Sequence, residues 1–235
     1  RCPVTSNWPH LVQQLADFAN PLVQRWGQPT LLVGHSLGGF LSAMTAAQHP
    51  HLAHGVLLLD SPLISGWRAT SLEVAKRTQL VANVSPGKIS RKRRNLWNSR
   101  EEALALFQSK KSFARWHPEV LQDYVAHGLS ATNDGRFTLH FTREEETAIY
   151  NTLPHNLNAM LRRHPLRCPA AFIGGLYSKE MKQVGMDMTL RVTHGRTMLV
   201  DGSHLFPMEH PHMTAAAIEA SLLNLQVAAA KHSKS

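Results

Sequence analysis

The chain has 235 residues, a formal net charge of +9, and 43% hydrophobic against 17% charged residues, which is the composition of a folded protein with a sizeable core rather than of a disordered one. No apolar run approaches the ~20 residues needed to cross a bilayer, so no membrane span is expected. The two cysteines, Cys2 and Cys168, are too few for a disulfide framework and favour a reducing compartment, so we expect a cytoplasmic protein.

The first predicted elements are a helix, a strand and a second helix. Apolar residues recur at helical spacing from Trp8 to Val23, and the apolar run Leu31-Leu32-Val33 after Pro29 is typical of a strand. Helical spacing resumes at Leu41. The segment between strand and second helix must therefore turn sharply.

That segment has the sequence Gly34-His35-Ser36-Leu37-Gly38-Gly39. A serine in G-x-S-x-G between a strand and a helix is typical of a nucleophile elbow, which exposes the serine hydroxyl. The turn is expected to need glycine at positions 34 and 38, because a Cβ there would collide where the strand folds against its helix. Ser36 is the predicted nucleophile.

Three histidines, His49, His51 and His54, follow the second helix. Their spacing could suggest a metal site, but no cysteine or carboxylate lies close enough in sequence to complete a familiar ligand set. Imidazoles there can also interact favourably with the helix dipole at the C-terminal end of the second helix. We predict no metal at this place. The next strand, residues 54–60, ends at Asp60.

Residues 63–165 interrupt the alternation of strands and helices and are predicted to form a mainly helical insertion. Ser99 and Thr142 each begin a capping-box pattern, and Pro118 fits the first turn of a helix that Gly128 ends. Residues 135–141 alternate apolar and polar side chains and predict a short strand.

The densest basic cluster, residues 91–94, lies in this insertion. Only Trp97 is close enough to supply base stacking, so a solvated face is favoured over a nucleic-acid interface, and no nucleic-acid partner is expected. A basic rim that steers anionic substrates is a third interpretation.

Two more strands are predicted at residues 170–174 and 197–200, followed by Gly202-Ser203-His204. A weakly nucleophilic serine needs a base, usually histidine. His204 follows the last strand and is the best candidate; the alternative is an ordinary loop histidine. Residues 231–235 are expected to be a polar tail.

These features resemble the α/β-hydrolase superfamily, on the strength of residues 34–39, the strand ending at Asp60 and residues 202–211. The resemblance implies a parallel sheet with helices on both faces, formed by residues 1–62 and 166–230, with residues 63–165 as a cap and the chemistry at the carboxyl ends of the strands. In that family several strands precede the first helix found here. We therefore expect an N-terminally truncated core whose residues 30–33 form an unpaired sheet edge.

The resemblance also implies that the backbone N–H of Leu37 is an oxyanion donor. The second donor usually comes from a loop that precedes the first helix and is absent from this sequence. Losing one such donor costs roughly 100- to 1,000-fold in turnover.

The acid of the triad has two candidates. The commonest family arrangement places an Asp after the strand at 170–174, where this chain has none. Asp60 occupies the alternative family position and is favoured, although a strand-end Asp also commonly caps a polar turn. Glu180 is the other candidate, unless it is a first-turn carboxylate favoured by the helix dipole.

The predicted function is a serine hydrolase that cleaves an ester, thioester or related acyl bond of a small molecule through Ser36, His204 and Asp60, without metal or organic cofactor. The alternatives are a catalytically silent binding protein of the same fold and an acyltransferase.

Overall fold

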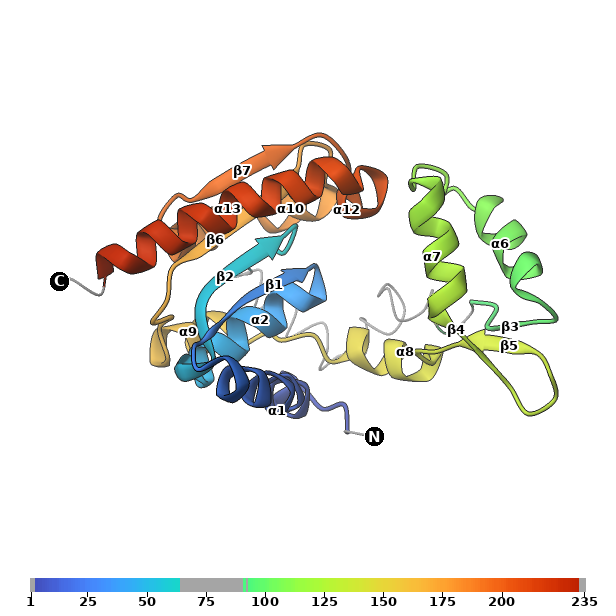
Figure 1. Ribbon diagram of the computed structural model, residues 1–235, viewed down its shortest axis with the longest axis horizontal. Coiled ribbons are helices and arrows are strands. Elements are labelled where there is room, and N and C mark those ends of the chain that lie inside the picture. Colours follow the sequence, from blue (N-terminus) through green and yellow to red (C-terminus); the bar gives the residue numbers. More distant parts are fainter. Residues whose placement is uncertain (1–2, 64–90, 92, 233–235) are drawn as a thin grey trace.

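The computed structural model describes residues 3–63, 91 and 93–232. Its centre is a four-stranded sheet with the order β1-β2-β6-β7 (Figure 1). All three strand pairs are parallel, so the carboxyl ends of the strands meet at one edge. The strands are β1 (Thr30–His35), β2 (Ala53–Leu59), β6 (Ala170–Gly175) and β7 (Thr197–Val200).

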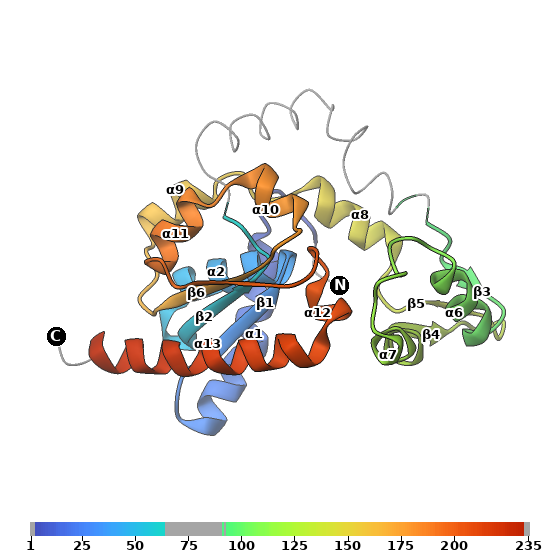
Figure 2. The ribbon, with the colours of Figure 1, turned by 90° about the horizontal axis from the view of Figure 1, so that it is seen from above.

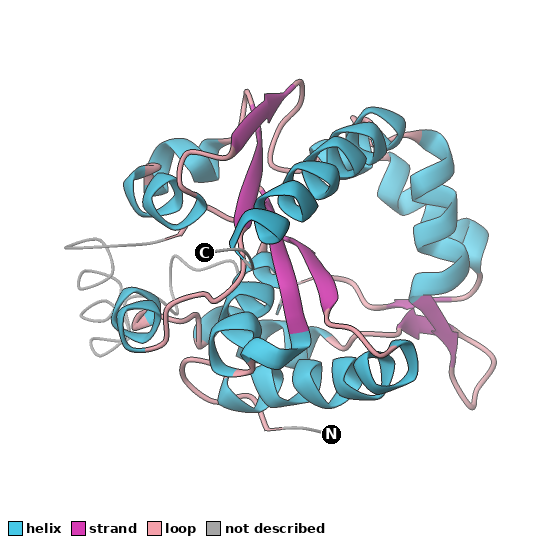
Figure 3. Ribbon diagram, turned by 60° about the vertical axis from the view of Figure 1, so that its left-hand side comes forward, coloured by secondary structure: helices cyan, strands magenta, loops and turns pink. Residues whose placement is uncertain are grey.

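Helices cover both faces of this sheet, as predicted (Figures 2 and 3). One face packs against the helices α1 (Pro9–Trp26), α2 (Leu37–Gln48), α9 (Leu157–Arg163) and α11 (Asp187–Thr193), and the other against α13 (Pro211–His232). Alternate residues of the central strands separate the two cores, because side chains of a strand point to opposite faces. In β2, Leu58 faces the first core, whereas Leu57 and Leu59 face the second.

Helix α13 differs from the sequence expectation about membranes. Among the described residues, its segment Pro211–Ala230 is long and apolar enough to cross a membrane by length and composition. In the structure the helix lies along the sheet, where Ala217 and Leu225 belong to the second core.

Strand β1 is an edge of the described sheet and pairs with β2. This agrees with the expected unpaired edge at residues 30–33. Val33 of this strand is 39% exposed.

The predicted insertion contains a compact unit with its own core. A three-stranded antiparallel sheet, in the order β3-β5-β4, packs with two helices, and the shared core includes Trp97 and Phe107. The elements are β3 (Leu96–Trp97), α6 (Arg100–Gln108), α7 (Pro118–Gly128), β4 (Leu129–Ala131) and β5 (Phe137–Leu139). We call this unit, residues 96–139, the cap unit; residues 64–90 and 92 of the insertion lie outside the described residues.

The cap unit lies on the side of the sheet where the strands end, facing α12 (Phe206–Glu209) across the carboxyl edge (Figure 1). The backbone N–H of His117 donates to the carbonyl of Met208 over 2.8 Å. That apolar side chains of the cap unit line a substrate pocket stays a prediction.

The end of the predicted insertion packs with the first core. Helix α8 (Arg143–Asn151) begins with a complete capping box between Thr142 and Glu145, as expected. Ser99 also caps α6, since its hydroxyl accepts from the N–H of Glu102. The return bond of a capping box differs here, because the Glu102 carboxylate accepts from the N–H of Asn98 and not from that of Ser99. Leu157 of α9 is buried with the first core, so the packing boundary falls before residue 157.

The basic cluster at residues 91–94 is partly engaged in ion pairs. Arg93 contacts Glu146 at 2.6 Å, and Arg94 pairs with Glu102. Lys92 lies outside the described residues. Two of the four charges are thereby neutralised inside the insertion.

Trp8 joins the first helix to α8, and this contact can be tested. Its fully buried indole Nε1 donates to Thr152 Oγ1 over 3.0 Å and to the Ile149 carbonyl over 3.3 Å. Because this change removes the hydrogen bonds of a fully buried indole and leaves space where its second ring was, Trp8→Phe is expected to lower the free energy of unfolding by about 1–3 kcal/mol. Urea denaturation measures this loss. The matched control is Trp26→Phe, whose ring is 57% exposed and whose effect should stay within about 0.5 kcal/mol. Equal effects of the two changes would contradict this account.

Candidate active site

Ser36 lies between β1 and α2 in a strained backbone conformation, with φ 53° and ψ −118°. A non-glycine residue rarely adopts a positive φ, and such strain persists only where neighbouring contacts enforce it. Three hydrogen bonds do so here: the Ser36 N–H donates to Leu59 O (2.9 Å), while its carbonyl accepts from Gly39 N (3.1 Å) and Ser61 Oγ (2.7 Å). The serine is thus fixed as the predicted elbow requires.

Of the two glycines that the elbow was predicted to need, one is required and the other is not. A Cβ on Gly34 would lie 2.5 Å from Gly39 N, so glycine is required there, as expected. A Cβ on Gly38 would meet nothing within 4 Å, so the expected collision at this position is wrong. The close approach occurs one residue later, because a Cβ on Gly39 would lie 2.5 Å from Ser61 Cβ.

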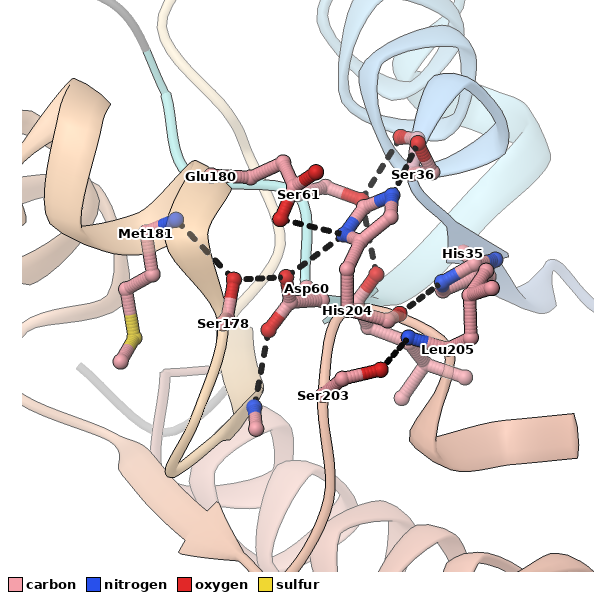
Figure 4. Close-up of polar contacts among 12 residues, drawn as sticks. His35, Ser36, Asp60, Ser61, Ser178, Glu180, Met181, Ser203, His204 and Leu205 are labelled. Atoms are coloured by element: carbon pink, nitrogen blue, oxygen red, sulfur yellow. Dashed lines mark hydrogen bonds and ion pairs between the residues drawn. The ribbon is translucent and has the colours of Figure 1, made fainter. Parts of the chain in front are cut away.

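His204 reaches the elbow from the loop after β7. Its Nε2 lies 3.0 Å from Ser36 Oγ and its Nδ1 lies 2.7 Å from Asp60 Oδ2 (Figure 4). The predicted serine, histidine and favoured acid are therefore brought together in one hydrogen-bonded line. Their strands β1, β2 and β7 all end at the same edge, which explains how residues so far apart in sequence meet.

Asp60 is a fully buried carboxylate with φ 45°. Besides His204, it accepts hydrogen bonds from the Gly175 N–H (2.8 Å) and from Ser178 Oγ (2.6 Å). Burial on its own would raise its pKa, but the bonds from His204, Ser178 and Gly175 together hold the pKa of Asp60 below its ordinary value. The carboxylate is therefore ionised at neutral pH and its donors fix its orientation.

Glu180, the alternative acid, lies in the first turn of α10 (Lys179–Val184). Its Oε2 is 4.0 Å from His204 Nδ1, beyond hydrogen-bond distance, and its side chain is 48% exposed. Both carboxylates therefore face the same imidazole nitrogen, and Asp60 makes the hydrogen bond. The structure favours Asp60 on distance, burial and the number of donors.

His35 supports the backbone of the histidine loop. Its Nε2 lies 2.7 Å from the carbonyl oxygen of His204, and the two ring centroids are 4.9 Å apart. Since a carbonyl only accepts, Nε2 carries the proton. Burial lowers the pKa of His35 below its ordinary value, which favours the neutral ring in this place.

Sequence reasoning missed several supporting residues. Ser178 directly precedes the helix whose first turn was considered for Glu180, so it could have been noticed as an N-cap, and it does cap α10 by accepting from Met181 N over 3.0 Å. Its second bond, to Asp60, spans 118 residues and has no sequence signal. The same holds for Ser61, which holds the elbow carbonyl.

Two further features concern ligands. Leu37 begins α2, and N–H groups in the first turn of a helix have no partner within it, so the N–H of Leu37 is available to an anionic oxygen.

Among the described residues, Asp60, Glu180 and His204 also offer three possible metal-ligand atoms within 4.8 Å of one another. A hydrogen bond already joins two of these atoms, which fits a histidine oriented by an acid better than an ion site.

Comparisons with known proteins agree on one family. The model of the alpha/beta hydrolase family matches residues 2–217. The chain is similar to two Alternaria alternata proteins. It is 26% identical over 129 residues to the abhydrolase domain-containing protein ACTT2, covering 52% of this chain and 44% of that protein. It is 24% identical over 230 residues to AFT2-1, covering 81% of this chain and 82% of that one.

Solved structures show the same fold. The peroxisomal alpha-beta-hydrolase Lpx1 from Saccharomyces cerevisiae has a TM-score of 0.67 at 15% identity, covering 96% of this chain and 63% of that one. E-2-(acetamidomethylene)succinate hydrolase has a TM-score of 0.64 at 20% identity (90% and 72% covered). The thioesterase domain from the curacin biosynthetic pathway has 0.64 at 18% (90% and 71%). The chain thus spans less than two thirds of the length of ACTT2 and of the Lpx1 chain.

The elbow glycines give a paired test. Gly34→Ala should lower the free energy of unfolding by about 1–3 kcal/mol, because its Cβ forces the backbone of the elbow apart. Gly38→Ala should be neutral or stabilising by up to about 1 kcal/mol, because alanine is the better helix former and meets no neighbour. Urea denaturation of both variants measures these changes. Similar losses of unfolding free energy in the two would show that the packing at residue 38 is tighter than described.

Proposed function

We propose that this chain, which belongs to the alpha/beta hydrolase family, is a serine hydrolase that cleaves an ester, thioester or related acyl bond of a small molecule. The observation that carries the proposal is the hydrogen-bonded line from Ser36 Oγ through His204 to the buried Asp60. This arrangement is the one that activates a serine hydroxyl in unrelated hydrolases.

The chemistry follows from the donors and acceptors of the site. In the resting state Asp60 accepts the Nδ1 proton of His204, which leaves Nε2 free to receive the Ser36 proton. As Ser36 Oγ attacks the substrate carbonyl, that proton moves to Nε2, and Asp60 stabilises the resulting imidazolium. His204 then gives the proton to the departing alcohol or thiol, and an acyl-enzyme forms. Water, deprotonated by His204, completes hydrolysis and restores Ser36.

The negative charge on the carbonyl oxygen needs donors. We infer that the Leu37 N–H supplies one, because it begins α2 and lies at the positive end of the helix dipole. Because the elbow backbone is fixed by Leu59, Gly39 and Ser61, this donor is held in place before substrate arrives.

A cysteine nucleophile fits the described residues less well. Burial raises the pKa of Cys168 to about 11, so its sulfur is a protonated thiol at neutral pH. Cys168 also precedes β6, at the amino-terminal end of the sheet, opposite the edge that holds His204.

The two alternatives make different predictions. A binding protein of this fold would bind a small molecule but turn over no ester. An acyltransferase would form the acyl-enzyme and pass it to an alcohol or amine in preference to water. Product analysis with p-nitrophenyl esters, in the presence and absence of an added acceptor, separates these alternatives from the proposed hydrolase.

Removal of the nucleophile or the base tests the proposal directly. Ser36→Ala should reduce turnover of p-nitrophenyl esters to background, and His204→Ala should cost nearly as much, because members of a triad act as a unit and their losses do not add. The thermal transition of Ser36→Ala should be close to that of the unmodified protein. Retained turnover in Ser36→Ala would refute the proposed nucleophile.

The acid is tested by comparing two neutral variants. Asp60→Asn should cut turnover by roughly 10⁴-fold, because the imidazole loses both its orientation and the charge that stabilises it. Glu180→Gln should have a much smaller effect, since Glu180 lies 4.0 Å from His204 Nδ1 and is half-exposed. The reverse ranking in kcat would assign the role to Glu180, and two mild effects would mean that a backbone carbonyl or water orients His204.

A further inference from the structure

A second carboxylate, Glu209 of α12, holds the loop that carries His204. Its side chain is only 3% exposed. Oε2 accepts from the N–H of Ser203 over 2.8 Å, and Oε1 accepts from Ser203 Oγ over 2.7 Å. Ser203 Oγ in turn accepts from the N–H of Leu205 over 3.1 Å. The residues on both sides of His204 are thus bonded into one network that ends on Glu209.

The backbone of this loop is built to approach the carboxylate closely. Gly202 has φ 124°, and a Cβ there would lie 3.0 Å from Glu209 Oε2 and 2.6 Å from Phe206 Cβ. Only glycine adopts this conformation without strain and leaves room for the carboxylate. The contact between the loop and Glu209 is therefore a packed one.

The same carboxylate meets the cap unit. Arg115 approaches Glu209 Oε2 at 3.3 Å with its guanidinium nitrogen. Two residues on, the N–H of His117 donates to Met208 O, and the His117 ring stands edge-on to that of His212 with centroids 5.9 Å apart. The short segment 115–117 of the cap unit therefore docks on α12, at the residue that holds the His204 loop.

A buried carboxylate is costly unless hydrogen bonds and a countercharge compensate it. Glu209 receives both, from Ser203 on one side and from Arg115 on the other. Oε2 contacts both the histidine loop and the cap unit, whereas Oε1 contacts only Ser203 of the loop. A shift of the cap unit that removes Arg115 leaves the charge less compensated and changes its hold on Ser203.

We propose that Glu209 is a positioning residue for His204, and that Arg115 couples the placement of the cap unit to the placement of the imidazole. The inference rests on the proposed function, because it assigns His204 the role of base. Substrate binding that docks the cap unit on α12 would then also fix the position of the His204 imidazole. The network therefore favours catalysis when the cap unit is docked.

The test reads the imidazole without needing turnover. The Nδ1 proton of His204, in its 2.7 Å bond to Asp60, should give a strongly downfield proton resonance that disappears in Asp60→Asn. Glu209→Gln should broaden or remove that resonance by letting the ring move, and Arg115→Gln should weaken it. Arg115→Lys, which keeps the charge, should restore it in part. Arg136→Gln removes an exposed cap-unit arginine paired with Asp134 and should leave it unchanged.

Kinetics with a p-nitrophenyl ester give the second readout. Glu209→Gln should lower kcat by about 10- to 100-fold with little change in KM, because a small displacement of a reacting group has effects of that size. Arg115→Gln should lower kcat by less than about tenfold. If Glu209→Gln does not fold, Ser203→Ala removes the hydroxyl of the same network and carries the same expectation.

The outcomes separate this inference from the proposed function. An unchanged resonance and unchanged kcat in both Glu209→Gln and Arg115→Gln overturn it. A change in KM with kcat unchanged overturns it as well. So does a loss of the resonance and of kcat in Arg136→Gln as large as that in Arg115→Gln, because it would mean a general effect of the cap unit. A wild-type protein that shows the resonance but turns over no ester would refute the hydrolase and leave the positioning network standing.

Discussion

The buried carboxylate of Asp60 is the interaction on which the rest of the site depends. It directly follows β2 and accepts hydrogen bonds from Gly175 at the end of β6, from Ser178 at the start of α10 and from His204 after β7. The connection between β6 and α10 and the loop after β7 are thereby both tied to one charge. Because each bond favours the ionised form, the donors that fix the loops also keep the pKa of the acid low, so structure and charge support each other.

Backbone strain is concentrated beside this charge. Ser36 and Asp60 both have positive φ and each directly follows its strand. Such conformations persist where surrounding contacts enforce them, and here the contacts are the bonds to Leu59 and Ser61 and the donors of Asp60. The sheet supplies the frame: parallel strands deliver the serine, the acid and the histidine to one edge from positions far apart in the chain. Helix α12 extends the frame to the cap unit through Glu209.

The sequence predicted what depends on local pattern. The elbow around Ser36, the histidine after the last strand and a sheet with helices on both faces all have short-range signals. The preference for Asp60 over Glu180 rested on strand order. Long-range contacts were out of reach: Gly39, rather than Gly38, is the crowded glycine because Ser61, 22 residues away, packs on it. Local pattern also gave no sign that α9, inside the predicted insertion, packs with the first core, or that Ala217 and Leu225 of α13 pack with the second.

The central claim is that His204, held by Asp60, activates Ser36 as a nucleophile. The most direct measurement is covalent labelling with a fluorophosphonate, followed by peptide mass spectrometry to locate the adduct. The account predicts a single adduct on Ser36 in the folded protein, formed at a rate that falls sharply in His204→Ala. An adduct on another residue, or labelling of Ser36 that proceeds equally fast without His204, would contradict it.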